Sequence, residues 1–115
     1  MDGVLSDGLP IDFSYPETFL RAAKSGLLNL DPWWALNEAL IKARSEQLAE
    51  RFPQLRLLPF SRRQDNDDVA CWNMDDSTIL IIDPFGIPGT EKVEIFSSID
   101  EWLRRSLDDF LTYDE

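Results

Sequence analysis

Residues 69–83 read VACWNMDDSTILIID, and this stretch decides the fold. Two apolar runs, VACWNM and TILIID, flank the tripeptide DDS at 75–77, whose residues are typical of a tight turn. Apolar side chains occupy both positions of the alternation in the first run, and residues 79–82 of the second are apolar without a break. Strands of this kind lie in the centre of a sheet that is covered on both faces. We therefore predict a central hairpin of two buried strands.

Two further runs extend the predicted sheet. LRLLPF at 55–60 precedes the hairpin, and KVEIF at 92–96 follows it after a longer loop at 83–91 that carries two prolines and two glycines. Both runs are rich in apolar residues and are bounded by polar or turn-forming segments. The sequence thus predicts a four-stranded, mainly antiparallel sheet.

Helical patterns stand on both sides of these strands. SYPETFLRAAKSG at 14–26 predicts a short helix that starts near Pro16 and stops at Gly26. Asp31 and Pro32 resemble an N-cap and a first helical position, so a second helix is expected over 33–52. Ser98 begins a capping box for a last helix over 99–111. The order of helix, helix, four strands and helix predicts a single α+β domain over 1–115, with 1–13 as an extended lead-in.

The two long helices each show an apolar face that is expected to pack on the sheet. In the helix over 33–52 that face comprises Trp34, Leu36, Leu40, Ile41, Ala43, Leu48 and Phe52. In the last helix it comprises Ile99, Trp102, Leu103, Leu107, Phe110 and Leu111. Trp33 and Trp34 would point about 100° apart on a helix. We therefore expect one of these two tryptophans to lie at the edge of the core, where a partner can reach it.

The charge is strongly and unevenly negative. The formal net charge is −11, with eight acids and six bases in residues 1–60 but fourteen acids and five bases in residues 61–115. Such a surface repels nucleic acid and anionic lipid and suits a basic protein partner. No apolar run is long enough to cross a membrane, the start MDGVLSDGLP does not resemble a secretory signal, and Cys71 is the only cysteine. A cytoplasmic location is the expectation.

The residue types exclude most catalytic machinery. The chain contains no histidine, which removes Ser-His-Asp and Cys-His nucleophiles and histidine-ligated metals. GIPGTEK at 86–92 lacks the spacing of a phosphate-binding loop, and the spacing after Asp65 does not fit an EF-hand. Because a loose Mg²⁺ or Ca²⁺ site at Asp65, Asp67 and Asp68 stays open, a carboxylate- or metal-dependent hydrolase is the less favoured alternative. We assign no catalytic residue, cofactor or metal.

Two stretches carry a family resemblance. LLPFSRRQDNDDVACW at 57–72, with the closing SIDEWLRRSLDDFL at 98–111, resembles the SUKH superfamily, which groups fungal Smi/Knr-type cell-wall regulators with many bacterial immunity proteins. The resemblance spans roughly residues 31–112, and it departs from the family where many members place a glycine after the acidic turn. It implies a binding fold without catalysis, whose bacterial members commonly neutralise a toxin domain encoded beside them, often a nuclease.

Charge and resemblance together predict an immunity protein that meets a basic toxin. The expected partner-binding residues lie in and next to two acidic turns: Arg62, Arg63, Asp65, Asp67, Asp68, Asp75 and Asp76. The two arginines could instead brace their loop through internal ion pairs. A housekeeping adaptor for another protein, and a solvated loop without function, are the other interpretations of the same pattern.

Overall fold

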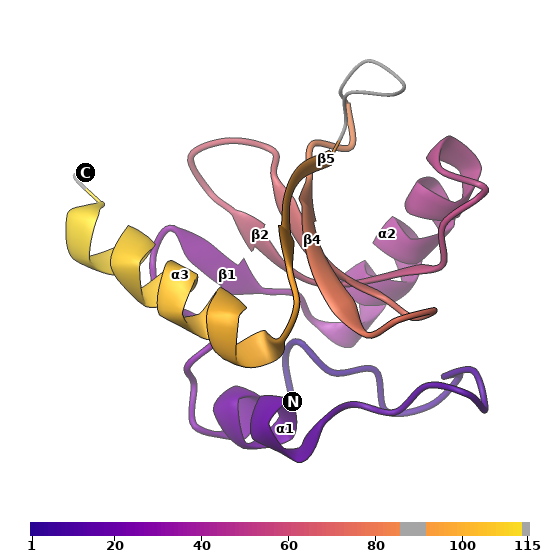
Figure 1. The fold of residues 1–115 in the computed structure, drawn as a ribbon, viewed down its shortest axis with the longest axis horizontal. Coiled ribbons are helices and arrows are strands. Elements are labelled where there is room, and N and C mark those ends of the chain that lie inside the picture. Colours follow the sequence, from indigo (N-terminus) through magenta and orange to yellow (C-terminus); the bar gives the residue numbers. More distant parts are fainter. Residues whose placement is uncertain (86–91, 114–115) are drawn as a thin grey trace.

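The computed structural model describes residues 1–85 and 92–113, with the backbone alone for Lys92 and Val93. Within this part the chain is an α+β fold of three helices and five strands (Figure 1). The elements are α1 (Glu17–Lys24), β1 (Trp33–Ala35), α2 (Glu38–Arg51), β2 (Leu57–Arg63), β3 (Val69–Asn73), β4 (Thr78–Ile82), β5 (Lys92–Phe96) and α3 (Ile99–Thr112). The loop predicted over 83–91 lies outside the described residues from 86 onward.

The five strands form one antiparallel sheet in sequence order, β1-β2-β3-β4-β5. The prediction of four strands is therefore wrong by one, because β1 lies in a segment that was assigned to a helix. The predicted central hairpin is confirmed, because β3 pairs with β4 in a register that sets Cys71 opposite Leu80. Its turn at 75–77 is closed by the Ser77 N–H, which donates to the Asn73 carbonyl over 2.8 Å. Antiparallel pairing of neighbouring strands places successive connections at alternate ends of the sheet.

The sheet is covered on both faces, as the two central strands predict. In Figure 1 α2 lies on one face and α3 on the other, with α1 below α3. Val69 and Cys71 belong to the smaller core under α2, whereas Ala70 and Trp72 belong to the larger core that includes α1 and α3. The 1–13 lead-in forms no helix or strand, yet its Leu5 and Phe13 are buried in that larger core. Burial of these two side chains anchors the lead-in to the core that α1 and α3 share.

The helix predicted over 33–52 is wrong in its first turn. Trp33–Ala35 is strand β1, with Trp34 opposite Arg62 of β2, and the helix starts only at Glu38. Asn37 is its N-cap, accepting from the Leu40 N–H over 2.9 Å. Pairing with β2 and burial of Trp33 outweigh the local helical pattern, because they satisfy backbone groups and bury a large side chain at once.

Strand alternation also decides which tryptophan reaches the surface. Trp33 is fully buried, whereas Trp34 is 46% exposed. The prediction that one of the two lies at the edge of the core is therefore confirmed, although opposite faces of a strand, rather than helical spacing, separate them. The apolar face predicted for the same helix is confirmed by the burial of Leu36, Ile41, Leu48 and Phe52, although α2 itself contains just Ile41 and Leu48 of these four. Leu40, by contrast, is exposed.

Helix α3 packs as predicted in its first half only. Ser98 accepts from the Glu101 N–H, and Ile99 and Trp102 are buried. The Glu101 carboxylate receives the Ser97 N–H instead of the N–H of the cap residue. The expectation that the apolar residues of the second half pack on the sheet is wrong, since these residues are about half exposed or more: Leu107, Phe110 and Leu111.

Candidate functional site

The connection between β2 and β3 is short and held at several points. The Arg63 N–H donates to the Asp68 carbonyl over 3.0 Å and so closes a loop of residues 64–67. Gln64 fastens that loop to the rest of the molecule: its N–H donates to the Pro32 carbonyl over 2.9 Å, and its side-chain amide to the Tyr113 hydroxyl over 3.0 Å. The carboxylates of this loop are therefore displayed on a fixed backbone.

The sequence context suggested that Arg62 and Arg63 belong to the loop. They are instead the last two residues of β2. Successive strand residues point to opposite faces of the sheet, so the pair is divided. Arg62 lies between Trp34 and Val69 in the register and shares the face of α2, while Arg63 lies beside Trp33 on the face of α3. The two guanidinium groups therefore lie on opposite faces of the sheet and have different neighbours.

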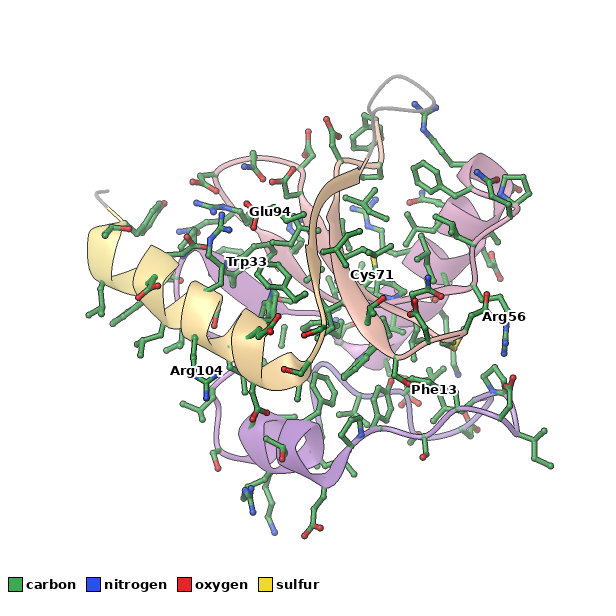
Figure 2. The ribbon with its side chains drawn as sticks, viewed as in Figure 1. Phe13, Trp33, Arg56, Cys71, Glu94 and Arg104 are labelled. Carbon is green, nitrogen blue, oxygen red and sulfur yellow. The ribbon has the colours of Figure 1, made fainter. Side chains whose placement is uncertain are left out.

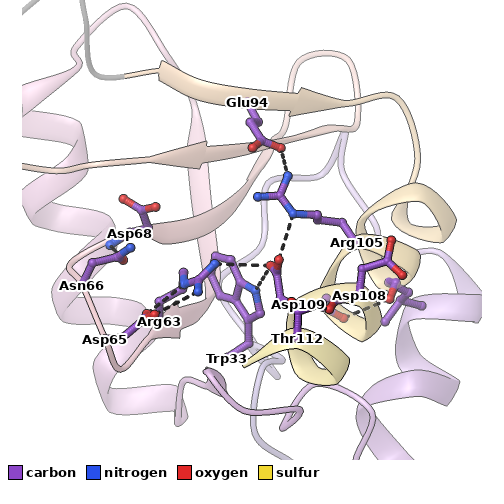
Figure 3. A network of polar contacts seen from close by, with 12 residues as sticks. Trp33, Arg63, Asp65, Asn66, Asp68, Glu94, Arg105, Asp108, Asp109 and Thr112 are labelled. Carbon is purple, nitrogen blue, oxygen red and sulfur yellow. Dashed lines mark hydrogen bonds and ion pairs between the residues drawn. The ribbon is translucent and has the colours of Figure 1, made fainter. Parts of the chain in front are cut away.

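Arg63 braces the loop from inside, which confirms that alternative for this arginine (Figure 3). Its Nε and one terminal nitrogen donate to the two Asp65 oxygens, each over 2.9 Å, and its other terminal nitrogen lies 3.4 Å from Asp109. The guanidinium centre is 5.6 Å from the centroid of the Trp33 ring. Because the Arg63 hydrogen bonds favour the ionised form, the pKa of Asp65 is held below its usual value.

Asp109 is the hub of this network and was missed by sequence reasoning. One of its oxygens accepts from the Trp33 indole N–H over 2.9 Å, and the other accepts from Arg105 over 3.1 Å. Arg105 extends the network by an ion pair to Glu94 of β5 (Figure 3). Four elements, β1, β2, β5 and α3, are joined in this way. The available signal was spacing, since residue 109 shares the helix face of Trp102 and Ser106, which are both buried.

Three carboxylates at the same end of the sheet lack a basic partner. Within the described residues Asp67, Asp68 and Asp83 form no ion pair, and Asp67 makes no hydrogen bond. The pKa of Asp68 is raised above its usual value, first by burial and then by the nearby negative charge of Asp83. We call Asp65, Asp67, Asp68 and Asp83 the acidic end.

The other predicted acidic turn lies elsewhere. Asp75 and Asp76 follow β3, whereas the acidic end precedes it, so the five residues of β3 separate the two groups by roughly 17 Å. Arg56 donates to Asp75 over 2.7 Å and also pairs with Asp12 (Figure 2 labels Arg56). Asp76 accepts from the Thr78 N–H and hydroxyl and so shapes its own turn. The structure therefore does not bring the seven predicted residues together on one surface.

Metal and nucleophile chemistry find little support in these positions. The described residues contain no group of three or more histidine, cysteine, aspartate or glutamate side chains that could hold a metal ion. Cys71 is fully buried, and burial raises the pKa of its thiol far above the usual value. A thiol in this state is neither ionised nor reachable at neutral pH. What the site offers is a fixed array of negative charge.

Comparisons with known proteins add no relative. No family model, curated protein or solved structure matches the chain significantly. In the described part of the chain, no helix is sufficiently long and apolar to span a bilayer.

Proposed function

We propose that this chain is a non-catalytic protein-binding domain that neutralises a basic bacterial toxin through its acidic end. The observation that carries the proposal is a group of carboxylates without basic partners at one end of the sheet: Asp67 and Asp68 in the fixed connection between β2 and β3, and Asp83 after β4. The resemblance of 57–72 and 98–111 to the SUKH superfamily supplies the class of partner. The specific form of this proposal is a cytoplasmic immunity protein for a toxin encoded beside it, with a nuclease as the first toxin activity to test.

The geometry favours recognition on physical grounds. Binding orders side chains and loops at a free-energy cost, and a loop that is already fixed by Arg63 and Gln64 avoids part of that cost. Complementary charge also accelerates encounter well above the neutral rate of about 10⁵–10⁶ M⁻¹s⁻¹. Asp75 and Asp76 are occupied with Arg56 and with their own turn, so we assign the contact to the acidic end.

The test is co-expression of the chain with a toxin domain encoded next to it. We expect rescue of growth, a stable complex, and association that slows as salt rises. Asp67→Lys should lower the affinity for that toxin by roughly tenfold. Asp108→Lys on α3 makes the same charge change at an exposed position that does not belong to the acidic end, and it should leave the affinity unchanged.

Three results would point to another interface or to another function. Equal affinity of a folded Asp67→Lys variant would move the interface away from the acidic end. Capture of a cellular protein unrelated to toxins, with no rescue of growth, would favour the adaptor. A rise in thermal stability with Mg²⁺ or Ca²⁺ that Asp67→Asn abolishes would favour the hydrolase.

A further inference from the structure

A cleft opens between α2 and the strand ends at the acidic end of the sheet. Its volume is about 290 Å³, at the lower limit of the roughly 300–1,000 Å³ typical of small-molecule pockets. A smaller hollow adjoins it and shares Arg44, Val69, Pro84 and Phe85 with it. We call the two together the α2 cleft. The remaining residues that line it are Leu36, Gln47, Leu48, Arg51, Arg62 and Asp67.

The charge of the α2 cleft is opposite to that of the chain. Three arginines and one aspartate line it, a formal charge of +2 in a protein of −11. Within the described residues neither Arg44 nor Arg62 forms an ion pair, and Arg44 donates to the neutral Gln47 side chain over 2.9 Å. By contrast, Arg56, Arg63 and Arg105 each contact two carboxylates. The cleft therefore holds positive charge that the fold itself does not use.

Apolar surface accompanies this charge. Leu48 and Val69 line the interior of the cleft, and Phe85 at its edge is 70% exposed. Trp34, directly opposite Arg62 on the same face of the sheet, is 46% exposed. Exposed aromatic and arginine side chains around a small apolar hollow are the composition of interface hot spots.

We infer that the α2 cleft binds a protein segment that presents one aromatic or branched apolar side chain next to a carboxylate. The volume suits one large side chain and not a cofactor, and the two unpaired guanidinium groups complement a carboxylate, which arginine binds through paired hydrogen bonds. Asp67 belongs to both the cleft and the acidic end, so the two surfaces are continuous. The inference rests on the proposed function in that the segment would come from the same partner.

The cleft can be probed without that partner. We would titrate the full chain with N-acetylphenylalanine, which carries an aromatic ring and a carboxylate, and follow backbone amide chemical shifts. The neutral N-acetylphenylalaninamide is the matched probe. We expect shifts at Leu48, Val69 and neighbouring residues, and roughly three- to tenfold weaker binding of the amide, as for a partly exposed ion pair.

Variants separate the charge from the apolar contribution. Arg44→Gln and Arg62→Gln should each remove most of the preference for the acid, and Phe85→Ala should weaken both probes alike. Arg104→Gln is the control, because Arg104 lies on α3 across the sheet from α2 (Figure 2). It should change neither affinity.

Equal binding of acid and amide, or shifts that avoid the cleft, would overturn the inference. So would binding of decanoate without binding of N-acetylphenylalanine, which would indicate a site for lipid-like acids. A toxin complex lost in Asp67→Lys but unchanged in Arg44→Gln and Arg62→Gln would retain the proposed function and reject the cleft. If the probe binds in the cleft but no toxin partner is found, the cleft is retained and the proposed function is rejected.

Discussion

Asp109 illustrates how much of this fold depends on one exposed-looking position of a helix. Its carboxylate is 14% exposed and faces the Trp33 indole N–H and the guanidinium groups of Arg63 and Arg105. Removing it leaves a buried donor and two cations without their shared acceptor, which is costlier than losing a surface ion pair.

We expect Asp109→Ala to lower the free energy of unfolding by about 2–3 kcal/mol. Asp108→Ala, one residue earlier on the exposed side of α3, should change it by less than about 0.5 kcal/mol. Urea unfolding of both variants measures the difference. Similar, small effects in both variants would show that the network does not stabilise the fold.

Asp68 and Asp65 make opposite predictions for the pH dependence of stability. The pKa of Asp68 is raised in the fold, so the unfolded chain loses this proton at lower pH, and stability falls as pH rises from the unfolded pKa of about 3.8 through the folded value. Asp68→Asn should therefore raise the melting temperature at pH 7, by roughly 1–3 °C, and gain nothing below pH 3.5.

Asp65→Asn is the matched comparison. Its pKa is lowered by Arg63, so its contribution is complete above pH 3.8 and is lost as pH falls through the folded value. This variant should lower the melting temperature at pH 7 and match the parent at the acid limit. Thermal melts across pH 3–7 test both, and a shift of the same sign in the two variants would contradict the assigned environments.

At the scale of elements, the start of α2 is the point where local and tertiary preferences compete. The segment before it pairs with β2, and two of its N–H groups have partners outside the sheet: the Trp33 N–H donates to the Leu30 carbonyl and the Ala35 N–H to the Asn29 side chain. This protects β1, an edge strand, from pairing with other chains. Asn37 then opens the helix.

We expect Asn37→Ala to destabilise the fold by about 1 kcal/mol, the usual cost of losing an N-cap. Asp31→Ala should cost less, because Asp31 caps no helix and accepts one exposed bond from the Trp34 indole. Chemical denaturation of the two variants distinguishes a helix capped by Asn37 from a longer helix capped by Asp31. A larger effect at Asp31 would support the longer helix that the sequence pattern predicts.

Elements whose sequence signal is local were predictable, and elements defined by a distant partner were not. The hairpin around 75–77 was predictable because alternation and turn residues are written in one continuous stretch. Strand β1 was not, because a three-residue strand next to a helix is defined by its partner β2 and not by its own pattern. The division of Arg62 from Arg63 was missed for a related reason: the predicted strand ended at Phe60, whereas β2 continues for three residues to Arg63.

At the scale of the whole molecule, charge is distributed so that two unlike surfaces meet. The acidic end and the α2 cleft lie at the same end of the sheet and share Asp67, while the arginine-rich network around Asp109 lies on the α3 face and reaches the acidic end through the ion pair of Arg63 with Asp65. A net charge of −11 on 115 residues also repels itself. The described ion pairs, several of them exposed, offset only part of that repulsion.

Salt should therefore stabilise this protein. Raising NaCl from 10 to 200 mM shortens the screening length from about 30 Å to less than 10 Å, which removes most long-range repulsion while sparing the buried contacts of Asp109. We expect an increase of roughly 0.5–1 kcal/mol in the free energy of unfolding at pH 7. Asp67→Asn and Asp108→Asn should each reduce that gain slightly, because each removes one unpaired negative charge. A stability that falls with salt would mean that exposed ion pairs such as Arg56 with Asp12 and Asp75 outweigh the net charge.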